Sequence, residues 1–403
     1  KQVGTDTDWI AVATGDHHSF GLKADGTLWG WGRNTWGQLG VGDYQTNYPS
    51  PIEVPGHTGW VSILGGGEHT LGLKSNGTLW AWGYNSAGQL GLDDTTARET
   101  PQQVGSDTTW RSIGIGDEHS LATRADGTLW SWGLNDDGQL GLGDTTTRDV
   151  PVQVGTRTDW VAASGGNWFS LAISSDGTAW ASGDNTYAEL GDGTFASRST
   201  FGQAGVLPDW VAAASGIVHT LVVADDGTLW SAGQNVYGEL GLGNTFQQNM
   251  LTRVGSDADW AAVDAGNYQS VALKLNGTLW AWGYNSDGTL GLGDNTDRLS
   301  PTKVGLDADW KMASTGGYST LAVKQDGTLW AWGDNPYGQL GIGDTSEPWQ
   351  PTQVGTDADW ATVTCAGYHT LAVKNDGTLW AWGYDGYGAL GLGSGDLTNR
   401  LSP

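Results

Sequence analysis

The sequence predicts an all-β protein: a single closed β-propeller of four-stranded antiparallel blades. Three observations lead to this prediction. Tryptophans return at a fixed interval, each interval carries the pattern of four short strands, and the two chain ends together complete one more interval. We expect eight blades, and a ring of seven blades with one unit left over is the alternative.

Tryptophan marks the repeat in three series. One series stands at Trp9, Trp60, Trp110, Trp160, Trp210, Trp260, Trp310 and Trp360. Another stands at Trp29, Trp80, Trp130, Trp180, Trp230, Trp280, Trp330 and Trp380. A third, two residues further on, fills six of eight places: Trp31, Trp82, Trp132, Trp282, Trp332 and Trp382. After one extra residue in the first unit the step is 50 residues, and these series hold 22 of the 25 tryptophans, so most tryptophan is scaffold.

The seventh unit illustrates the four strands. A short apolar stretch runs from Trp310 to Gly316, and residues 320–324 then alternate apolar with small or polar side chains. That alternation is the period of a half-buried strand. The return strand covers 328–333, and a fourth short strand follows a long loop, near 351–354. Sheets of four such short strands are too small to be stable alone.

A hairpin turn and two unlike faces follow from the return strand. The preceding Asp-Gly pair predicts a primed turn, because glycine accepts a positive φ. Trp330 and Trp332 share one face of the strand, and Leu329 and Ala331 share the other. Packing the tryptophan face of each blade on the small face of its neighbour interdigitates large and small side chains. A buried tryptophan hides roughly 150–250 Å², an upper bound of about 4–6 kcal/mol.

The chain ends predict that the ring closes. Joined end to end, residues 399–403 and 1–4 reproduce the internal junction 298–305. We expect the strand at Val3 to complete the blade begun by the last tryptophan-rich hairpin. The chain 1–403 is then one domain of eight units, with approximate bounds 1–50, 51–100, 101–150, 151–200, 201–250, 251–300, 301–350 and 351–403.

Charge and composition restrict the partners. The chain has 44 Asp and Glu against 18 Lys and Arg, a net charge of −26. Such a surface repels phosphate backbones, so we expect no nucleic acid but another protein with a basic or cationic patch. The single cysteine, Cys365, excludes an internal disulfide. No apolar stretch approaches the roughly 18 residues of a membrane span, so we expect no membrane association.

The start of the chain and its surface bear on location and assembly. It begins Lys1-Gln2 without Met and without the apolar region of a signal peptide, so we expect a trimmed or mature piece. The location is unknown from the sequence, with an extracellular or cell-surface place favoured over the cytoplasm. We expect a monomer.

One repeat pattern resembles a known family. The run 326–333, Asp-Gly-Thr-Leu-Trp-Ala-Trp-Gly, is followed by Asn335 and by 338–344, Gly-Gln-Leu-Gly-Ile-Gly-Asp. This pattern, with Pro351 and the Val-Gly pair at 354–355, resembles the regulator-of-chromosome-condensation repeat in its bacterial form. The resemblance covers nearly the whole chain in eight copies. It implies a propeller of seven blades, whereas the unbroken step of the units favours eight.

The resemblance also implies possible activities. The founding activity of the family is guanine-nucleotide exchange on a small nuclear GTPase while bound to chromatin. That activity relies on a protruding insertion, for which these units leave no room, and chromatin binding suits a basic surface. By architecture the chain is also similar to the secreted propeller-type β-lactamase inhibitory protein, which binds enzymes through an aromatic and acidic loop face.

Candidate binding residues are the aromatics that fall outside the three tryptophan series. We expect the loop entering the second strand and the loop leaving the third strand to lie on one face of the ring, opposite the Asp-Gly turns. The candidates on these loops are Trp36, Tyr84, Trp168, Tyr187, Tyr237, Tyr268, Tyr284, Tyr318, Tyr337, Tyr368, Tyr384 and Tyr387. An aromatic surface with interspersed Asp is typical of a protein-binding hot spot. Loop support is the alternative role, above all for Tyr187, Tyr237, Tyr337 and Tyr387, and Trp36, Trp168 and Tyr284 are the preferred candidates.

Other residue groups predict no chemistry. Five histidines share one repeat position: His18, His69, His119, His219 and His369. We expect them to brace loops by hydrogen bonds rather than to bind a metal, because blades keep equivalent atoms apart. No nucleophile motif, calcium loop or dinucleotide fingerprint is present, so we expect no catalysis, metal or cofactor.

The sequence therefore predicts a non-enzymatic protein-binding scaffold. A guanine-nucleotide exchange factor and a carbohydrate-binding module are the alternatives, since tyrosine and tryptophan with aspartate also suit sugar rings. The fourth and fifth units deviate most. Ala179 replaces Leu, Ser182 and Ala232 replace the third-series tryptophan, and Phe195, Phe201 and Phe246 appear nearby. These changes indicate either a repacked blade interface or a specialised partner edge.

Overall fold

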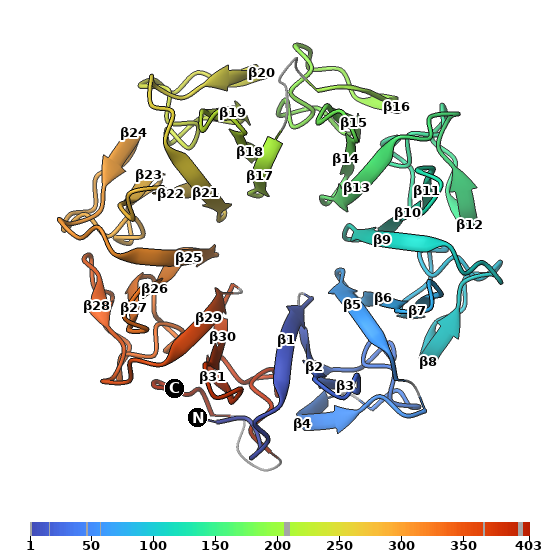
Figure 1. Ribbon diagram of the computed structural model, residues 1–403, viewed down its shortest axis with the longest axis horizontal. Helices are drawn as coiled ribbons and strands as arrows, with labels where there is room; N and C mark the ends of the chain where they lie inside the picture. Colours follow the sequence, from blue (N-terminus) through green and yellow to red (C-terminus); the bar gives the residue numbers. More distant parts are fainter. Residues whose placement is uncertain are drawn as a thin grey trace.

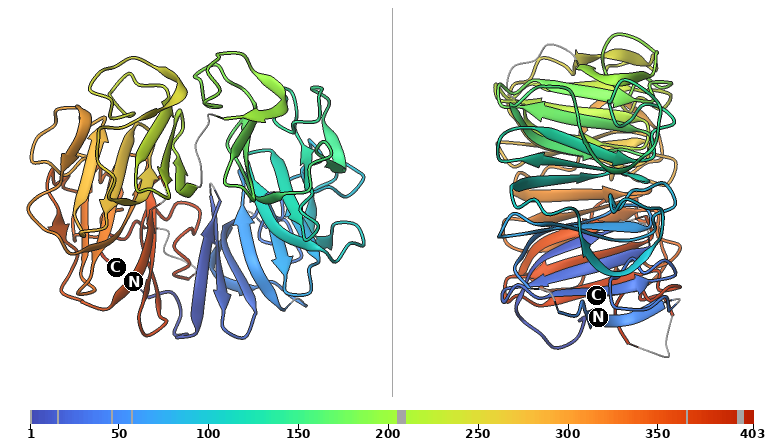
Figure 2. Two further views of the ribbon diagram at one scale, coloured as in Figure 1. Left: turned by 45° about the horizontal axis from the view of Figure 1, so that its top comes forward. Right: turned by 90° about the vertical axis from the view of Figure 1, so that its right-hand side faces the viewer.

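The computed structural model is a closed ring of eight antiparallel sheets, and none of its described residues is helical (Figure 1). It describes residues 2–15, 17–45, 47–56, 58–204, 210–365, 367–393 and 398–403. Seen from its edge the ring is a flat disc, and the two termini lie side by side (Figure 2). The predicted all-β propeller with eight blades is confirmed, and the seven-bladed alternative is wrong.

Each blade begins with an innermost strand and continues outward in chain order. The innermost strands are β1 (Trp9–Thr14), β5 (Trp60–Gly65), β9 (Trp110–Ile115), β13 (Trp160–Gly165), β17 (Trp210–Ser215), β21 (Trp260–Ala265), β25 (Trp310–Gly316) and β29 (Trp360–Cys365). The second strands are β2 (His18–Lys23), β6 (His69–Lys74), β10 (His119–Arg124), β14 (Phe169–Ser174), β18 (His219–Ala224), β22 (Gln269–Lys274), β26 (Ser319–Lys324) and β30 (His369–Lys374).

Six of the eight third strands carry paired tryptophans, and the outermost strands complete the blades. The third strands are β3 (Leu28–Arg33), β7 (Leu79–Gly83), β11 (Leu129–Gly133), β15 (Ala179–Gly183), β19 (Leu229–Gly233), β23 (Leu279–Gly283), β27 (Leu329–Gly333) and β31 (Leu379–Gly383). The outermost strands are β4 (Asn47–Glu53), β8 (Arg98–Gln103), β12 (Arg148–Gln153), β16 (Arg198–Gln203), β20 (Gln248–Arg253), β24 (Arg298–Lys303) and β28 (Thr352–Gln353).

The hairpin between the second and third strands differs from the predicted primed turn. In the seventh blade Gly327 has φ +81°, and its N–H donates to the Lys324 carbonyl at 3.0 Å. The equivalent hydrogen bonds of the other blades are 2.9–3.0 Å long. Among the described residues only Asp93 and Ala188 combine a side chain with a positive φ, so Asp326 does not. A primed turn of type I′ needs a positive φ at both central residues. The observed loop is the three-residue form that ends in a left-handed glycine, and the Asp326 carboxylate caps it by accepting the Thr328 N–H at 2.9 Å.

The blades pack tryptophan against leucine and alanine, as the two unlike faces predict. Between the seventh and eighth blades, Leu329 and Ala331 lie in one buried cluster with Trp360 and Trp382. In the preceding interface Trp332 is 0% exposed, and its indole N–H donates to the Thr289 carbonyl at 3.0 Å. The indole therefore fills the space between two blades and also bonds the loop of the earlier one.

The eighth blade closes the ring with both chain ends. Its own three strands end at β31, where the Val3 N–H donates to the Leu379 carbonyl at 2.8 Å. The expected closure by Val3 is confirmed. The C-terminal segment adds a second piece, because Arg400 and Gly383 exchange backbone hydrogen bonds of 2.8 and 3.0 Å. The outermost strand of this blade is thus shared between the two ends of the chain.

A basic side chain clamps the tryptophans at the hairpin end of most blades. In the seventh blade the Lys324 ammonium lies 4.9 Å from the Trp310 ring centroid and 4.7 Å from that of Trp330. Asp307 pairs with the same ammonium at 2.7 Å. The equivalent cations over two rings are Lys23, Lys74, Arg124, Lys274 and Lys374, with Arg157 in the fourth blade. Each cation thereby stacks on the indole faces, which attract positive charge.

The fourth and fifth blades meet at an altered interface. Six interfaces have a tryptophan at the position of Ala232. A seventh has Ser182, whose hydroxyl donates to the Gln139 carbonyl at 3.1 Å. Thr220 Oγ1, at the position that elsewhere donates to this loop carbonyl, has no hydrogen-bond partner in the described part of the chain. The buried cluster here is built from Phe169, Ala179, Ala181, Leu190 and Ala204. The deviating sequence therefore repacks a blade interface, with smaller side chains and fewer bonds to the neighbouring loop.

Replacing an inter-blade tryptophan tests this packing. Trp332→Ala removes a fully buried indole and its hydrogen bond, so we expect the free energy of unfolding to fall by about 3–5 kcal/mol. Urea denaturation measures the change. Leu306→Ala is the control, because Leu306 is 92% exposed and its replacement should stay within about 0.5 kcal/mol. A loss at Trp332 no larger than that at Leu306 would contradict the packing scheme.

Candidate functional site

The candidate aromatics lie on loops at one end of the strands. In the seventh blade Gly316 pairs with Ser319, so the loop that holds Tyr318 lies at the end opposite the hairpin turn. Ser319 pairs in turn with Gly333, which places the leaving loop beside the entering loop. The same register recurs in the other blades, so all twelve candidates share one face, which we call the aromatic face.

Ring contacts gather ten of the twelve candidates into three groups. The first tyrosine cluster contains Tyr237, Tyr268, Tyr284 and Tyr318, with neighbouring ring centroids 5.1–6.5 Å apart. The second tyrosine cluster contains Tyr337, Tyr368, Tyr384 and Tyr387, with centroids 5.0–6.0 Å apart. Trp36 and Tyr84 form a pair at 4.9 Å. Most contacts are edge-to-face or tilted, the arrangements that aromatic quadrupoles favour.

Exposure separates the candidates into two kinds. Five are exposed: Trp36, Trp168, Tyr187, Tyr368 and Tyr387. The other seven are half-buried: Tyr84, Tyr237, Tyr268, Tyr284, Tyr318, Tyr337 and Tyr384. Among the preferred candidates, Trp36 and Trp168 offer 41% and 51% of their surface to a partner, whereas Tyr284 lies within the first tyrosine cluster. Loop support stays a prediction: of the four tyrosines for which it was preferred, Tyr187 and Tyr387 are exposed, whereas Tyr237 and Tyr337 are half-buried.

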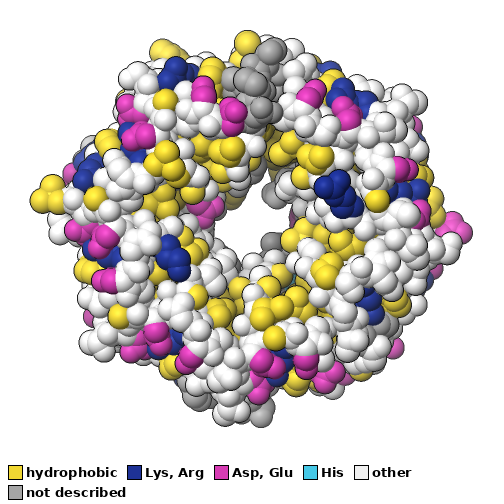
Figure 3. All heavy atoms as spheres, in the orientation of Figure 1, with side chains coloured by type: hydrophobic (Ala, Val, Ile, Leu, Met, Phe, Trp, Pro, Cys, Tyr) yellow, Lys and Arg dark blue, Asp and Glu magenta, His cyan; other side chains and the backbone are white. Residues whose placement is uncertain are grey.

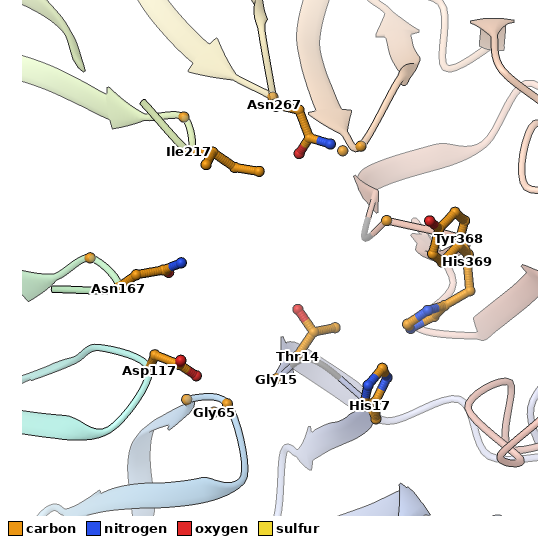
Figure 4. A pocket seen from close by; sticks show the side chains of 18 of the residues that line it. Thr14, Gly15, His17, Gly65, Asp117, Asn167, Ile217, Asn267, Tyr368 and His369 are labelled. Carbon is orange, nitrogen blue, oxygen red and sulfur yellow. The ribbon is translucent and has the colours of Figure 1, made fainter. Parts of the chain in front are cut away.

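A cavity of about 890 Å³ opens at the centre of the aromatic face (Figure 4). Glycine-rich loops from all around the ring line it, and the four residues of the second tyrosine cluster form part of its wall. Figure 4 shows His17 and Tyr368 on one side of the opening and Asp117 and Asn167 on another. Tyrosines therefore line one arc of the cavity, and a mixture of polar and apolar side chains lines the rest, Asn167 and Ile217 among them.

Carboxylates crowd the same loops, which makes this face acidic as well as aromatic. Burial, with the nearby carboxylates of Glu347 and Asp287, raises the pKa of Asp334 to about 6. Burial and the charges of Asp117 and Asp136 raise the pKa of Glu118. A raised carboxyl pKa means that the negative charge is poorly compensated in place. Sequence reasoning missed these residues individually, because their spacing in the chain does not show which loops meet.

Cations at this end of the blades are paired with carboxylates. Arg33 pairs with Glu68 at 2.6 Å. The arginines that begin outermost strands beside the last glycine of the third strand pair with aspartates at 2.5–2.9 Å: Arg98, Arg148, Arg198 and Arg298. The clamping lysines and arginines sit at the hairpin end, where strand pairs such as Trp9 with Lys23 begin. Figure 3 shows the hairpin side, where basic and acidic side chains lie next to each other and hydrophobic side chains surround the opening. The exposed Ile10, Val61 and Val211 belong to the innermost strands at this end.

The repeated histidines link neighbouring blades. His119 Nε2 lies 2.8 Å from Ser170 Oγ, and His219 Nε2 lies 2.9 Å from Ser270 Oγ, in each case on the next blade. The expected hydrogen bond is present, but it links the second strands of two neighbouring blades instead of bracing a loop. Burial lowers the pKa of both imidazoles to about 4, so they are neutral near pH 7. Within the described ranges no group of three His, Cys, Asp or Glu side chains is placed to hold a metal ion.

The described residues define an eight-bladed β-propeller with an aromatic and acidic loop face around a central cavity. The chain belongs to the regulator of chromosome condensation (RCC1) repeat family. One profile of this repeat matches residues 25–73, 76–123, 126–173, 226–273, 276–323 and 326–373. A second profile matches residues 9–38, 60–89, 110–139, 260–289 and 360–389. The predicted family resemblance is thereby confirmed.

Similar proteins match over short stretches. Human HERC3, a probable E3 ubiquitin-protein ligase, is 39% identical over 94 residues, which are 23% of this chain and 9% of HERC3. The ultraviolet-B receptor UVR8 of Arabidopsis thaliana is 36% identical over 92 residues, 23% of this chain and 21% of UVR8. Human protein RCC2 is 45% identical over 80 residues, 20% of this chain and 15% of RCC2. The matched stretches thus span about a fifth or less of these relatives.

Solved structures share the fold over most of the chain. Prp20p from Saccharomyces cerevisiae superposes with a TM-score of 0.66 at 22% identity, covering 87% of this chain and 92% of that chain. Human WBSCR16 gives a TM-score of 0.64 at 23% identity, covering 81% and 92%. At this identity the similarity shows the propeller fold alone. No helix of the described residues is long and apolar enough to cross a membrane.

Replacing one histidine tests the inter-blade hydrogen bonds through their pH dependence. The pKa of His119 is about 4 in the fold and about 6.5 in an unfolded chain, so its stabilisation is present above pH 6.5 and is lost as pH falls toward 4. Between pH 7 and pH 5 this one group should remove about 2 kcal/mol of stability. We expect His119→Gln, which copies Gln269 of the sixth unit, to lose that much less on acidification. Urea unfolding at the two pH values measures it, and an equal loss in both proteins would contradict the assignment.

Proposed function

We propose that this chain is a non-enzymatic scaffold that binds a cationic segment of another protein on its aromatic face. The carrying observation is that ten of the variable aromatics form three ring groups on one face that also holds poorly compensated carboxylates, and that one of these groups lines the central cavity. Exposed tryptophan and tyrosine are the side chains that most often dominate binding energy at protein interfaces. The face therefore combines anchoring rings with a charge that attracts basic partners.

Electrostatics supports a basic partner in particular. The net charge of −26 attracts cations at long range, which raises association rates and makes them sensitive to salt. At short range, a partner's cation would compensate carboxylates such as Asp334 and Glu118, whose pKa values are raised by burial and by neighbouring negative charges. Binding of this kind should weaken as ionic strength rises.

Relatives with this fold bind proteins. Prp20p has described binding properties to Gsp1p and histones, and Kap60 has been crystallised bound to the same yeast protein. Histones are basic, so one relative binds proteins of the charge proposed here. These partners are those of Prp20p. What we carry over from Prp20p to this chain is only the use of a propeller for protein binding.

Replacing exposed aromatics tests the scaffold. Trp36→Ala, Trp168→Ala and Tyr368→Ala together remove three exposed rings and leave the buried packing intact, so we expect at least a tenfold loss of partner retention. Affinity capture from the native source, compared by quantitative mass spectrometry, measures the retention. Ile10→Ala with Val61→Ala is the matched control, because both side chains are exposed at the hairpin end.

Two results would count against this face. Equal retention by the triple variant and the wild type would exclude these rings as the contact surface. Loss of the same proteins from the hairpin-end control would move the contact to the opposite side of the ring. If the amount of partner retained does not change with ionic strength, the electrostatic part of the proposal is wrong.

Guanine-nucleotide exchange is the second candidate. Its support is the fold similarity to Prp20p, a protein that binds Gsp1p. An exchange factor accelerates release of bound GDP from a small GTPase, which a fluorescent nucleotide reports directly. The scaffold proposal expects no acceleration across a panel of GTPases, and acceleration of any one of them would favour the second candidate.

A further inference from the structure

One repeat position holds a buried polar side chain beneath the aromatic face. It is glutamine in four units and glutamate in two: Gln38, Gln89, Gln139, Gln339, Glu189 and Glu239. In every one of these a side-chain oxygen accepts the backbone N–H of the residue two positions earlier, at 2.7–3.1 Å. This shared bond holds the tight turn that carries Trp36, Tyr187, Tyr237 or Tyr337. The second polar atom of the side chain is therefore the part that varies.

Glutamine and glutamate place opposite chemistry at that second atom. The Gln38 amide donates to the Glu68 carboxylate of the next blade, and the Gln339 amide donates to Asp334 at 3.4 Å. The amide nitrogens of Gln89 and Gln139 have no hydrogen-bond partner among the described residues. Glu239 presents an acceptor oxygen, Oε1, in place of this donor. Glu239 is 0% exposed, and within the described part of the chain its Oε1 has no hydrogen-bond partner. A buried acceptor without a donor is unfavourable, so a hydrogen-bond donor from outside the chain would be bound favourably at this oxygen.

The first tyrosine cluster lies over Glu239. The Tyr237 ring is 5.4 Å from that of Tyr268 and 5.1 Å from that of Tyr284. The Tyr237 N–H donates to the other oxygen of Glu239 at 2.7 Å, so the carboxylate lies at the base of this group. Glu239 is also one of the negative groups that raise the pKa of the Tyr268 hydroxyl, after burial and other tyrosines. The three rings and the unpartnered oxygen thus belong to one small site.

The second tyrosine cluster is a natural control for this site. Its Tyr337 ring is 5.2 Å from Tyr368 and 5.0 Å from Tyr384, nearly the same arrangement one repeat pair further on. Beneath it stands Gln339, whose amide already has an acceptor. The two clusters therefore differ in a donor against an unpartnered acceptor, and also in exposure, since Tyr368 is exposed whereas the equivalent Tyr268 is half-buried.

We propose that Glu239 with Tyr237, Tyr268 and Tyr284 forms a receptor for one side-chain cation, an ammonium or guanidinium group of the bound protein. The cation donates the hydrogen bond that Glu239 Oε1 lacks and lies against tyrosine faces, which attract positive charge. Rearrangement of the half-buried rings admits it. This inference rests on the proposed scaffold function and names the place on the aromatic face where a basic residue of the partner anchors.

Small cations test the receptor without the partner. The probes are the N-acetyl methylamides of arginine and lysine, with the citrulline compound as the neutral counterpart, titrated by calorimetry near pH 7.5. We expect the wild type to bind a cationic probe with one site and to bind the citrulline probe at least tenfold more weakly. Glu239→Gln should weaken the cationic probe at least tenfold. It should also fold, because glutamine occupies this position in four units.

Two matched variants define the site. Glu189→Gln makes the same change in the fourth unit, where the entering loop of the next blade offers Val218 in place of a tyrosine, so cation binding should not change. Gln339→Glu places a carboxylate under the second tyrosine cluster and should raise the stoichiometry from one to two. Wild-type affinity in Glu239→Gln, a loss in Glu189→Gln, a stoichiometry that stays at one, or no binding of either cationic probe would overturn the receptor.

The two proposals fail separately. The Trp36, Trp168 and Tyr368 triple variant leaves the receptor residues in place, so it should lose partner retention and still bind the cationic probes. If the triple variant loses the partner but Glu239→Gln binds the cationic probes as the wild type does, the receptor proposal is wrong and the scaffold proposal stands. If Glu239→Gln loses the probes but the triple variant retains the partner, the scaffold proposal is wrong and a cation site remains.

Discussion

The structure depends on the contact between one indole and the loop of the preceding blade. Trp332 is completely buried between two blades, and a buried N–H needs an acceptor. That acceptor is the Thr289 carbonyl, on the loop that leaves the third strand of the earlier blade. Trp282 does the same with the Glu239 carbonyl at 2.8 Å. Packing the ring and positioning the aromatic face are therefore the same interaction, so the scaffold holds the candidate site in place.

Where that hydrogen bond is missing, the interface between two blades has fewer bonds to the loop of the earlier blade. Ala232 brings no indole to the interface between the fourth and fifth blades, and Thr220 leaves its hydroxyl without a partner among the described residues. The loop of the fourth unit, with Tyr187 and Glu189, therefore lacks the two bonds that the carbonyls of Gln38, Gln89, Glu239 and Thr289 receive. The first tyrosine cluster begins in the very next unit, where Trp282 and Ser270 both donate to Glu239. Beyond the altered interface, the loop at the first tyrosine cluster therefore receives both bonds.

The repeat made much of the fold predictable. Third-series tryptophans with leucine and alanine behind them predict radial packing, and the match of the chain ends predicts closure through Val3. The prediction of a primed turn in the hairpin was wrong, because an Asp-Gly pair suits both a primed turn and the observed three-residue loop with one left-handed glycine. The prediction named only Val3 for the closure, although the same match sets Arg400 at the position of Arg298, the first residue of β24.

For the candidate site, the sequence by itself determined which residues vary and that they share one face, because strand direction alternates along the chain. Only the tertiary structure decided which of them touch. Tyr237 lies 31 positions before Tyr268 and 47 before Tyr284, yet the three rings meet because neighbouring blades interleave their loops. The same holds for Glu239: an aligned repeat shows glutamate in place of glutamine, but its burial and its unpartnered oxygen arise from side chains of the next blade. Periodicity is a property of one unit, whereas contact between units depends on the geometry of the closed ring.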